Sequence, residues 1–379
     1  MNSARANARY MRLALRLARQ GYGATSPNPM VGAVLVKAGR IIGRGWHHRA
    51  GDPHAEIEAL RDAESRGQSP RGATLYVTLE PCCTQGRTPP CTGAILAMGV
   101  KRVVAGATDP NPRHHGKGFG VLEAGGVEVR ANILASECER LNEAFNHWIV
   151  RRLPFVTVKA AMTLDGKIAT ASGESKWITG EQARRFGMHL RQGADAILAG
   201  VNTVLADNPS LTVRPDGGKE DGCGLKRGHL RRIILDARAR TPLSAKVISD
   251  DYRELTTLVA SEAAAKSRVA ALAKRVRVLT APCSAPGLLD LPWLLKTLGA
   301  ENVTSLLVEG GGEVNASFLM GGLAQRIAFF YAPRILGGRD SRRSVAGDGA
   351  RSLDEALRLT DLEWQRLGAD WLLTARVAS

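Results

Sequence analysis

The chain has 379 residues, of which 44% are hydrophobic, so it is long enough for two domains that each bury a core. Its net charge of +16 is compatible with nucleic-acid binding, but aromatic residues make up only 5% of it and argue against a base-stacking surface. Six cysteines in so long a chain, with no secretory leader or membrane-spanning run, predict a protein of the reducing cytoplasm.

The first 128 residues alternate between helical and strand-like patterns. Residues 1–20 are basic and amphipathic, which predicts a helix packed on a sheet rather than a targeting peptide. Strands are expected at 31–36, 41–45, 74–79, 103–107 and 127–129, and helices at 54–63, 92–98 and 118–124. This order is typical of a layered α/β domain.

His54 and Glu56 form a His-x-Glu pair at the start of the predicted helix 54–63. Gly51-Asp52-Pro53 precedes the pair, and Asp followed by Pro is typical of a helix N-cap and first turn. Residues two apart on a helix face different sides. We therefore expect His54 to bind a metal, and Glu56 to reach a water on that metal without binding it.

Cys82 and Cys91 add two thiols after the predicted strand 74–79. Catalytic zinc takes three protein ligands and keeps one position for water, so His54 and two thiolates would complete the protein side. Pro81-Cys82 is interpreted as a second helix start, whose positive end favours a thiolate. Zinc acidifies its water and Glu56 accepts the proton, which is the chemistry of a zinc-dependent deaminase.

The other histidines close to this motif and the other cysteines of the chain are not interpreted as metal ligands. His47 and His48 are predicted to be loop or substrate-contact residues, because three metal ligands are already accounted for. The remaining cysteines are interpreted as ordinary buried or surface thiols, with the first as the only rival ligand: Cys83, Cys138, Cys223 and Cys283.

A predicted helix at 135–150 ends where Arg151-Arg152-Leu153-Pro154 begins a new strand, so the domain junction is placed near residue 150. The second half alternates again, with strands expected at 155–161, 194–199, 231–235, 256–260, 276–279, 304–308 and 326–333. Residues 214–228 are rich in Gly, Lys and Asp and are expected to form an exposed, mobile insertion.

The glycine run 310–312 follows a predicted strand and precedes a predicted helix. Such a turn can hold a phosphate on backbone N–H groups, or it can be only structural. The stretch lacks the G-x-G-x-x-G fingerprint, so both interpretations stay open.

Ordered motifs along the chain closely resemble those of the bifunctional riboflavin-biosynthesis deaminase/reductase family. Its deaminase half is matched by Ser26-Pro27-Asn28-Pro29-Met30-Val31-Gly32-Ala33, His54-Ala55-Glu56, Leu79-Glu80-Pro81-Cys82, Gly86-Arg87-Thr88-Pro89-Pro90-Cys91 and Asp109-Pro110-Asn111-Pro112. Its reductase half is matched by Lys159-Ala160-Ala161-Met162-Thr163-Leu164-Asp165-Gly166-Lys167, Ser175-Lys176-Trp177-Ile178-Thr179, Ala206-Asp207-Asn208-Pro209-Ser210-Leu211 and Val308-Glu309-Gly310-Gly311. One departure is Cys83-Thr84, where the family often has Ser-His, so a substrate contact at Thr84 is expected to differ.

The resemblance implies an α/β protein with a cytidine-deaminase-like three-layer α/β/α domain at 1–150 and a dihydrofolate-reductase-like α/β domain at 151–379. It implies a hydrolase that deaminates 2,5-diamino-6-(5-phosphoribosylamino)pyrimidin-4(3H)-one and an oxidoreductase that reduces the ribosyl group to ribityl phosphate. One Zn(II) per chain and NADPH are the implied cofactors. The expected partners are a small phosphorylated pyrimidine and further copies of the chain, with no nucleic acid and no membrane.

Residue roles follow from the same resemblance. The catalytic residue is Glu56, and the metal ligands are His54, Cys82 and Cys91. Cofactor contacts are implied for Ala161, Trp177, Thr203, Asp207, Gly311, Gly312, Glu313, Val314, Asn315, Ala316 and Ser317. Substrate contacts are implied for Asn28, Lys159, Ser175, Arg191, Leu211, Arg214 and Glu309, where the two arginines suit a phosphate.

Two alternatives of other classes remain. A polynucleotide-editing zinc deaminase with an appended binding domain is favoured only by the charge, and it predicts deamination of a base in RNA without oxidation of a pyridine nucleotide. A structural zinc protein would need a fourth protein ligand and would not depend on Glu56.

Overall fold

The computed structural model describes residues 3–86, 89–214, 230–285 and 287–378. Of the insertion expected at 214–228, residues 215–228 lie outside the described residues, and Cys223 is one of them. The chain divides into two compact units, Met1–Arg152 and Leu153–Ser379. The expected junction at residue 150 lies in the last turn of helix α6 (Glu143–Arg151). Among the described helices, none combines the length and the apolar character needed to cross a membrane.

The first unit is built on a five-stranded sheet in the order β2-β1-β3-β4-β5. Strand β1 pairs antiparallel with β2 and β3, and β3, β4 and β5 are parallel. The strands are β1 (Gly32–Lys37), β2 (Arg40–Trp46), β3 (Thr74–Leu79), β4 (Arg102–Ala107) and β5 (Glu128–Arg130). Each of the expected strands is present, with bounds shifted by up to a few residues.

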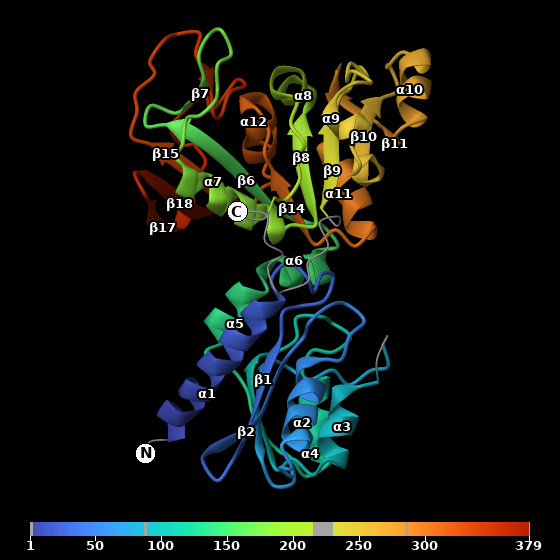
Figure 1. The fold of residues 1–379 in the computed structure, drawn as a ribbon, viewed down its shortest axis with the longest axis vertical. Helices are drawn as coiled ribbons and strands as arrows, with labels where there is room; N and C mark the ends of the chain where they lie inside the picture. The colour runs from blue at the N-terminus through green and yellow to red at the C-terminus, as the bar shows by residue number, and fades with distance from the viewer. Residues whose placement is uncertain (1–2, 87–88, 215–229, 286, 379) are drawn as a thin grey trace. The chain divides into compact units, whose positions relative to one another are not determined.

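Helices cover both faces of this sheet and make three layers. The helices are α1 (Ser3–Ala18), α2 (Ala55–Ser65), α3 (Cys91–Ala97), α4 (Lys117–Ala124), α5 (Ala135–Leu141) and α6, with a 3-10 turn at Arg19–Gly21. Leu35 and Val77 pack with α2, α3 and α4, whereas Val34 and Tyr76 face α1 and α5. Figure 1 shows α1 and α5 on one side of β1 and β2, and α2, α3 and α4 on the other.

The single helix expected at 135–150 is instead two helices, α5 and α6, because Asn142 leaves the helical conformation between them. The Asn142 amide exchanges hydrogen bonds with the backbone of Met30, accepting from its N–H at 2.8 Å and donating to its carbonyl at 2.9 Å. This tertiary contact, across 112 positions of sequence, holds the segment that carries Asn28.

The second unit is built on a nine-stranded sheet in the order β11-β10-β9-β8-β14-β6-β15-β18-β17. All neighbours from β11 to β15 are parallel, and β18 and β17 add an antiparallel edge. The strands are β6 (Phe155–Thr163), β8 (Ala196–Gly200), β9 (Arg231–Leu235), β10 (Thr256–Ser261), β11 (Arg277–Ala281), β14 (Ser305–Val308), β15 (Arg326–Ala332), β17 (Leu359–Leu367) and β18 (Asp370–Val377). The sequence predicted the seven parallel strands and did not predict β17 and β18.

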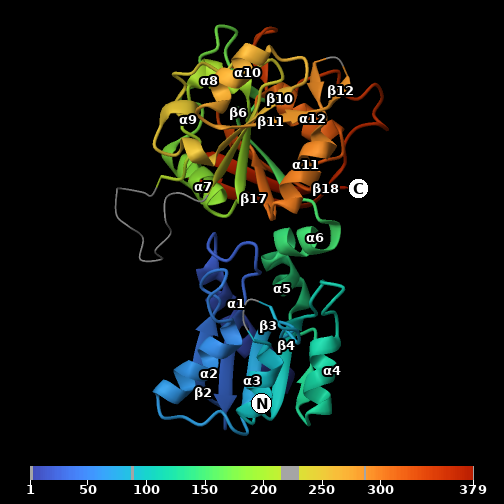
Figure 2. The same ribbon diagram turned by 90° about the vertical axis from the view of Figure 1, so that its right-hand side faces the viewer.

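Helices again cover both faces. Helices α11 (Leu291–Ala300) and α12 (Gly312–Met320) pack on one face, and α7 (Glu181–Gln192), α8 (Val201–Asp207), α9 (Lys246–Ser249) and α10 (Lys266–Ala273) pack on the other. In Figure 2, α11 and α12 lie to the right of the sheet and α7 and α9 to the left. Two short ladders complete the unit, β7 (Lys167–Ala169) with β16 (Arg342–Arg343) and β12 (Cys283–Ala285) with β13 (Leu288–Leu289).

Candidate functional site

The side chains of His54, Cys82 and Cys91 meet in the first unit, with their ligand atoms within 4.8 Å of one another. His54 Nδ1 lies 3.5 Å from the Cys82 sulfur and 3.3 Å from the Cys91 sulfur. Zinc bonds of about 2.3 Å to sulfur and 2.1 Å to nitrogen, at a tetrahedral angle, place sulfur and nitrogen about 3.6 Å apart. The three residues therefore fit one tetrahedral zinc ion.

The backbone positions these ligands differently from the sequence prediction. Helix α2 begins at Ala55 with His54 as its N-cap, so Asp52 does not cap it. The expected helix start at Pro81-Cys82 is also wrong, since Cys82 lies in a loop after β3 and α3 begins at Cys91. The N–H of Cys91 at this helix start points to the Cys82 sulfur at 3.4 Å. Hydrogen bonding between the two side chains lowers the pKa of Cys82 and raises that of Cys91, so the pair holds one thiolate, on Cys82.

Close packing of β2 against α2 sets the depth of His54 and Glu56. A Cβ at Gly43 would lie 2.2 Å from the carbonyl oxygen of Ala59, and one at Gly45 would lie 2.4 Å from that of Ala55. Only glycine permits this approach. The first turn of α2 is thereby fixed against the sheet, next to the metal ligands.

Glu56 is only 3% exposed and stands on the first turn of α2 beside the three ligands. Burial, together with the negative charge of Cys82, raises the pKa of Glu56 to about 7. A carboxyl group with a pKa near neutrality can both accept and return a proton at physiological pH.

Asn28 is connected to this centre through His47, whose ring centroid lies 5.3 Å from that of His54. The Asn28 Nδ2 is 3.1 Å from His47 Nε2, and His47 Nδ1 is 3.1 Å from the carbonyl oxygen of Pro53. Since that carbonyl accepts only, Nδ1 carries the proton and Nε2 accepts from the Asn28 amide. The Asn28 Oδ1 is then presented as an acceptor. The sequence left His47 undecided between loop and substrate contact, because its burial, with 2% exposed, is a tertiary property.

Glu80 organises the loop that follows β4. This buried carboxylate accepts hydrogen bonds from the backbone N–H groups of Asp109 at 3.0 Å, Gly116 at 2.9 Å and Gly118 at 2.8 Å. The loop is thereby tied to the segment that carries Cys82. Within the described residues, Cys83 is not part of the ligand group, and the exposed Thr84 lies 3.4 Å from His114 Nε2.

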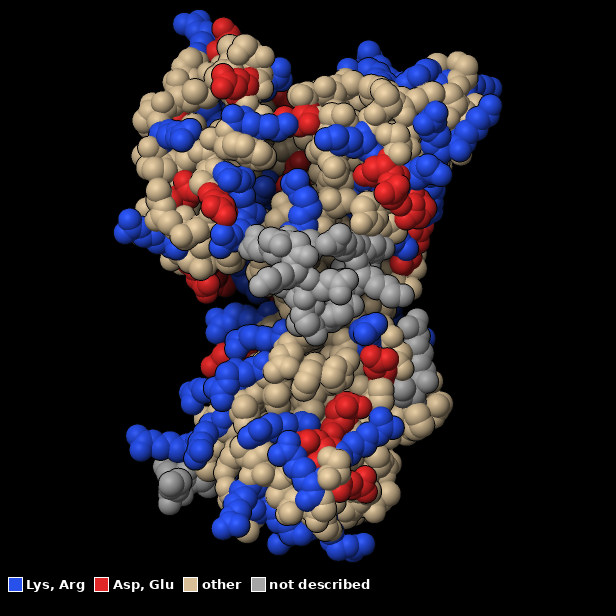
Figure 3. Space-filling model, viewed as in Figure 1, with Lys and Arg blue, Asp and Glu red and all other residues tan. Residues whose placement is uncertain are grey.

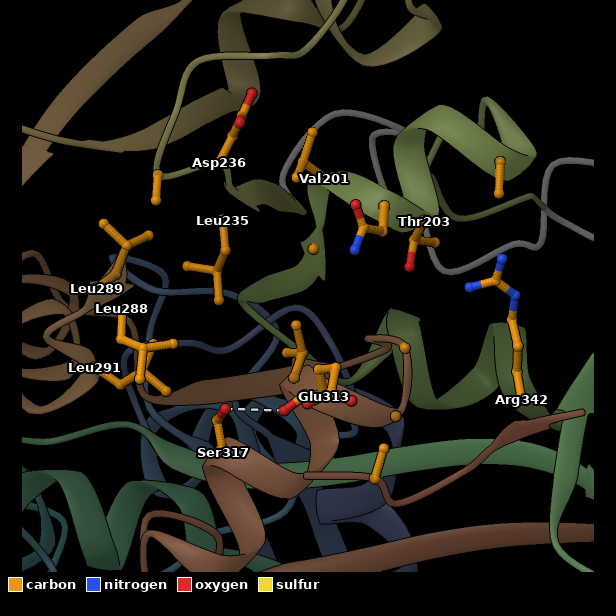
Figure 4. Close-up of a pocket in the computed structure, with 18 of the residues that line it drawn as sticks. Val201, Thr203, Leu235, Asp236, Leu288, Leu289, Leu291, Glu313, Ser317 and Arg342 are labelled. Atoms are coloured by element: carbon orange, nitrogen blue, oxygen red, sulfur yellow. Dashed lines mark hydrogen bonds between the residues drawn. The ribbon is translucent and has the colours of Figure 1, made fainter. Parts of the chain in front are cut away.

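A cleft of about 880 Å³ opens in the second unit where β8, β9 and β14 end. The carboxyl ends of parallel strands are the usual ligand-binding edge of such a sheet. Of the implied cofactor and substrate contacts, those that line the cleft are Ser175, Thr203, Asp207, Gly311, Gly312, Glu313, Val314 and Ser317. Figure 4 labels Thr203, Glu313 and Ser317 among them. The hydroxyl of Ser175 donates to Asp207 Oδ1 at 3.2 Å, which joins two of these positions.

The glycines of the β14–α12 turn have different environments. A Cβ at Gly310 would lie 2.5 Å from Val314 Cβ, and one at Gly312 would lie 2.3 Å from the Arg343 carbonyl oxygen. At Gly311, by contrast, a Cβ would meet only Thr203 Oγ1, at 4.0 Å. Gly310 and Gly312 therefore serve packing, whereas Gly311 leaves open space in the cleft beside the first turn of α12, as a phosphate-binding turn requires.

Several implied cofactor contacts do not line the cleft. Asn315 and Ala316 face the interior, and the Asn315 amide donates to the Ser344 carbonyl oxygen at 2.8 Å. Trp177 is 61% exposed and stacks with the Arg184 guanidinium at 4.8 Å. Ala161 lies on β6, on the same face as Lys159.

Lys159, Arg191 and Glu309 form a largely buried ionic cluster. Arg191 makes a bidentate pair with Glu309, with both hydrogen bonds at 2.8 Å, and Lys159 Nζ lies 3.4 Å from the same carboxylate. Burial alone would raise the pKa of Glu309, but the charges of Arg191 and Lys159 lower it to about 2. Arg191 also donates to the Thr212 carbonyl oxygen at 3.0 Å, so three of its five N–H donors are already used.

The last two implied substrate contacts are among the final described residues before position 215. Leu211 is 3% exposed and belongs to the core, whereas Arg214 is exposed. On the face seen in Figure 3, Lys and Arg side chains are spread over both units and interspersed with Asp and Glu.

Comparison with known proteins gives matches over nearly the whole chain. Residues 154–373 match a family model described as the RibD C-terminal domain, and residues 4–107 match the cytidine and deoxycytidylate deaminase zinc-binding region. The riboflavin biosynthesis protein RibD of Actinobacillus pleuropneumoniae is 41% identical, over 98% of this chain and 95% of its own length. The RibD of Aquifex aeolicus is 43% identical, over 96% of each chain.

Solved structures of this family also match nearly the whole chain. The structure of Acinetobacter baumannii RibD superposes with a TM-score of 0.87 at 36% identity, covering 100% of both chains. A Thermotoga maritima diaminohydroxyphosphoribosylaminopyrimidine deaminase/5-amino-6-(5-phosphoribosylamino)uracil reductase superposes with a TM-score of 0.82 at 34% identity, covering 99% of both chains. These likenesses extend over both units.

Proposed function

Because the chain belongs to the RibD family of bifunctional deaminase/reductases of riboflavin biosynthesis, we propose that its first unit is a zinc-dependent hydrolase and its second an NADPH-dependent reductase. The proposed substrate is 2,5-diamino-6-(5-phosphoribosylamino)pyrimidin-4(3H)-one, in keeping with the name of the Thermotoga maritima relative. Deamination of the ring comes first, and reduction of the ribosyl group to ribityl phosphate follows.

The observation that carries the deaminase is the approach of His54, Cys82 and Cys91 to one another beside the buried Glu56. Zinc bound by these three ligands supplies an activated water next to the ring. Glu56 accepts the proton of that water and delivers it to the leaving amine, so that each turnover restores its starting state. Asn28, held by His47, offers Oδ1 to an N–H group of the pyrimidine.

The reductase is assigned to the cleft at the ends of β8, β9 and β14. The open space at Gly311 and the N–H groups of the first turn of α12 suit the pyrophosphate of NADPH. The nicotinamide ring supplies the hydride, and the chain fixes its orientation. The cluster of Lys159, Arg191 and Glu309 is proposed to contact the ribosyl phosphate side of the substrate, with N–H donors that Arg191 has not used.

A single substitution separates the two activities. Glu56→Gln is expected to abolish ammonia release from the diaminopyrimidine phosphate, while NADPH oxidation with the already deaminated substrate continues. Glu58→Gln is the matched control, because Glu58 stands on the same helix and pairs with Arg61 at the surface. Ammonia release and the decrease in NADPH absorbance are measured in separate assays.

The outcomes discriminate between the candidate functions. If both activities vanished in a folded Glu56→Gln protein, the division between the two units would be wrong. If ammonia came from RNA and NADPH was never consumed, the polynucleotide-editing function would take the place of this proposal.

A further inference from the structure

One end of the second-unit cleft is formed by the turn after β9, residues 236–241. Arg238 and Arg240 are exposed residues of this turn that line the cleft, and the buried Ala239 lies between them. The family resemblance gave no role to either arginine. Two guanidinium groups from one turn make this end of the cleft strongly positive.

The turn is held in one conformation by side chains beneath it. The Asp236 carboxylate accepts hydrogen bonds from the N–H and the hydroxyl of Thr241, both at 2.7 Å. Arg268, from α10, donates to the carbonyl oxygens of Ala239 at 3.1 Å and Thr241 at 2.8 Å. The backbone under the two arginines is therefore preorganised, which lowers the entropic cost of binding a ligand there.

The charges of the two arginines are not neutralised by the chain. No carboxylate of the described residues forms an ion pair with Arg238 or Arg240. Arg240 donates to the neutral Asn202 Oδ1 at 2.7 Å, which leaves it further N–H donors. The nearby Asp236 is buried and binds Thr241 through Oδ2, and in Figure 4 its carboxylate points away from Leu235 and Leu289.

An apolar wall adjoins this positive end. Leu235 at the end of β9 lies beside Leu288, Leu289 and Leu291 (Figure 4). Leu288 is 60% exposed although it lines the cleft, so the wall offers apolar surface to a ligand. An apolar slot next to two arginines that form no ion pair among the described residues matches a flat, uncharged ring joined to a phosphate.

We propose that Leu235, Leu288, Leu289 and Leu291 hold the adenine of the nucleotide, and that Arg238 and Arg240 bind the phosphate on its ribose 2′-oxygen. The two arginines thereby select NADPH over NADH, because that phosphate is the only difference between the two nucleotides. This inference rests on the proposed reductase function. Arginine suits the role, since its planar N–H groups bind a phosphate through two parallel hydrogen bonds.

The test measures binding apart from catalysis. Isothermal titration calorimetry on the full-length, zinc-loaded chain compares 2′,5′-ADP with 5′-AMP, and NADPH with NADH. The wild type is expected to bind the member of each pair with the 2′-phosphate about tenfold more tightly or better. In Arg238→Gln/Arg240→Gln, that preference is expected to fall to within about twofold, while 5′-AMP and NADH bind as before.

The control is Arg253→Gln/Arg275→Gln, which removes the same charge from two arginines of this unit that do not line the cleft. It is expected to keep the wild-type preference. Retention of the preference in Arg238→Gln/Arg240→Gln, or an equal loss for all four ligands, would overturn the assignment of the arginines. A wild type that binds neither NADPH nor 2′,5′-ADP would instead overturn the proposed reductase function.

Discussion

His47 has no place in the His-x-Glu and cysteine pattern, yet it joins two parts of the deaminase site. It accepts from Asn28 on one side and donates to the Pro53 carbonyl oxygen on the other, directly before His54, the proposed metal ligand. Burial lowers the pKa of His47, which keeps the ring neutral and Nε2 available as an acceptor. Asn28 therefore depends on His47 for the orientation of its amide.

Replacement of His47 by Ala is expected to reduce kcat/KM for deamination about ten- to hundredfold, because the Asn28 amide loses its partner. Zinc content, measured by metal analysis, and NADPH oxidation with the deaminated substrate are expected to stay at wild-type levels. His47→Gln retains one donor and one acceptor and is expected to recover part of the activity. Equal losses in the Ala and Gln variants would contradict a role through hydrogen bonding.

Glu309 gives the second unit a specific pH dependence. Its pKa is lowered from 4.5 to about 2, so it stabilises the fold above pH 4.5, and this contribution is lost as the pH falls toward 2. The shift corresponds to a stabilisation on the order of 3 kcal/mol at neutral pH. Glu309→Gln lacks this ionisable carboxylate. The difference in free energy of unfolding between wild type and variant is therefore expected to narrow as the pH falls from about 5 to 2. Denaturant unfolding at a series of pH values measures this difference, and a constant difference would contradict the ionic cluster.

At the scale of elements, the turn between β14 and α12 contains three consecutive glycines with different roles: two allow close packing and one leaves space for a ligand. Gly310 and Gly312 allow the turn to lie against Val314 and the segment after β16, and Gly311 faces the cleft as the N-cap of α12. Gly311 has φ −74° and ψ 176°, which any residue adopts, so backbone strain does not require glycine there. The free space above it accounts for the glycine.

Gly311→Ala and Gly310→Ala are therefore expected to fail in different ways. Gly311→Ala leaves stability within about 0.5 kcal/mol of wild type and weakens NADPH binding, because its methyl group enters the space of the ligand. Gly310→Ala costs about 1–3 kcal/mol, because its methyl group overlaps Val314. Thermal unfolding and calorimetric titration of both variants check this. Tight NADPH binding by Gly311→Ala would place the pyrophosphate elsewhere.

At the scale of the whole molecule, each unit has a sheet and buried clusters of its own. Leu35 and Leu75 belong to a cluster of the first unit, and Val158 and Leu306 to one of the second. The three proposed metal ligands lie in the first unit and the cleft in the second. A ligand of one unit therefore stabilises that unit by its own binding free energy.

Zinc chelation and NADPH are expected to act on separate unfolding transitions. Removal of zinc lowers the transition of the first unit, since the ion binds only the folded arrangement of its three ligands. NADPH at about 100 times its dissociation constant stabilises the second unit by about 2.7 kcal/mol. Differential scanning calorimetry resolves the two effects. A single transition that both ligands shift equally would show that the units unfold together.

The chemistry of the site could be predicted from sequence because its residues are close in the chain and few in kind. A His-x-Glu pair and two cysteines are enough to specify a zinc site, and hydrophobic alternation placed the parallel strands. Helix starts were predicted less well, because Asp52-Pro53 and Pro81-Cys82 have local features of a helix start that the tertiary packing does not use. Strands β17 and β18 were not predicted. Strand β17 is almost entirely exposed, so burial imposes no apolar alternation on its sequence. Strand β18 is largely buried and was missed all the same.

The sequence by itself determined the order of the two domains and the family, and it predicted the candidate metal ligands and proton carrier. Only the tertiary structure decided which distant side chains meet, since such pairs leave no local pattern. Arg191 on α7 reaches Glu309, directly after β14, across 118 positions, and Arg238 after β9 lines one cleft with Leu288 of β13. Short sequence motifs therefore predict the chemistry of a site, whereas the packing of helices on the sheet decides which distant side chains form a binding site.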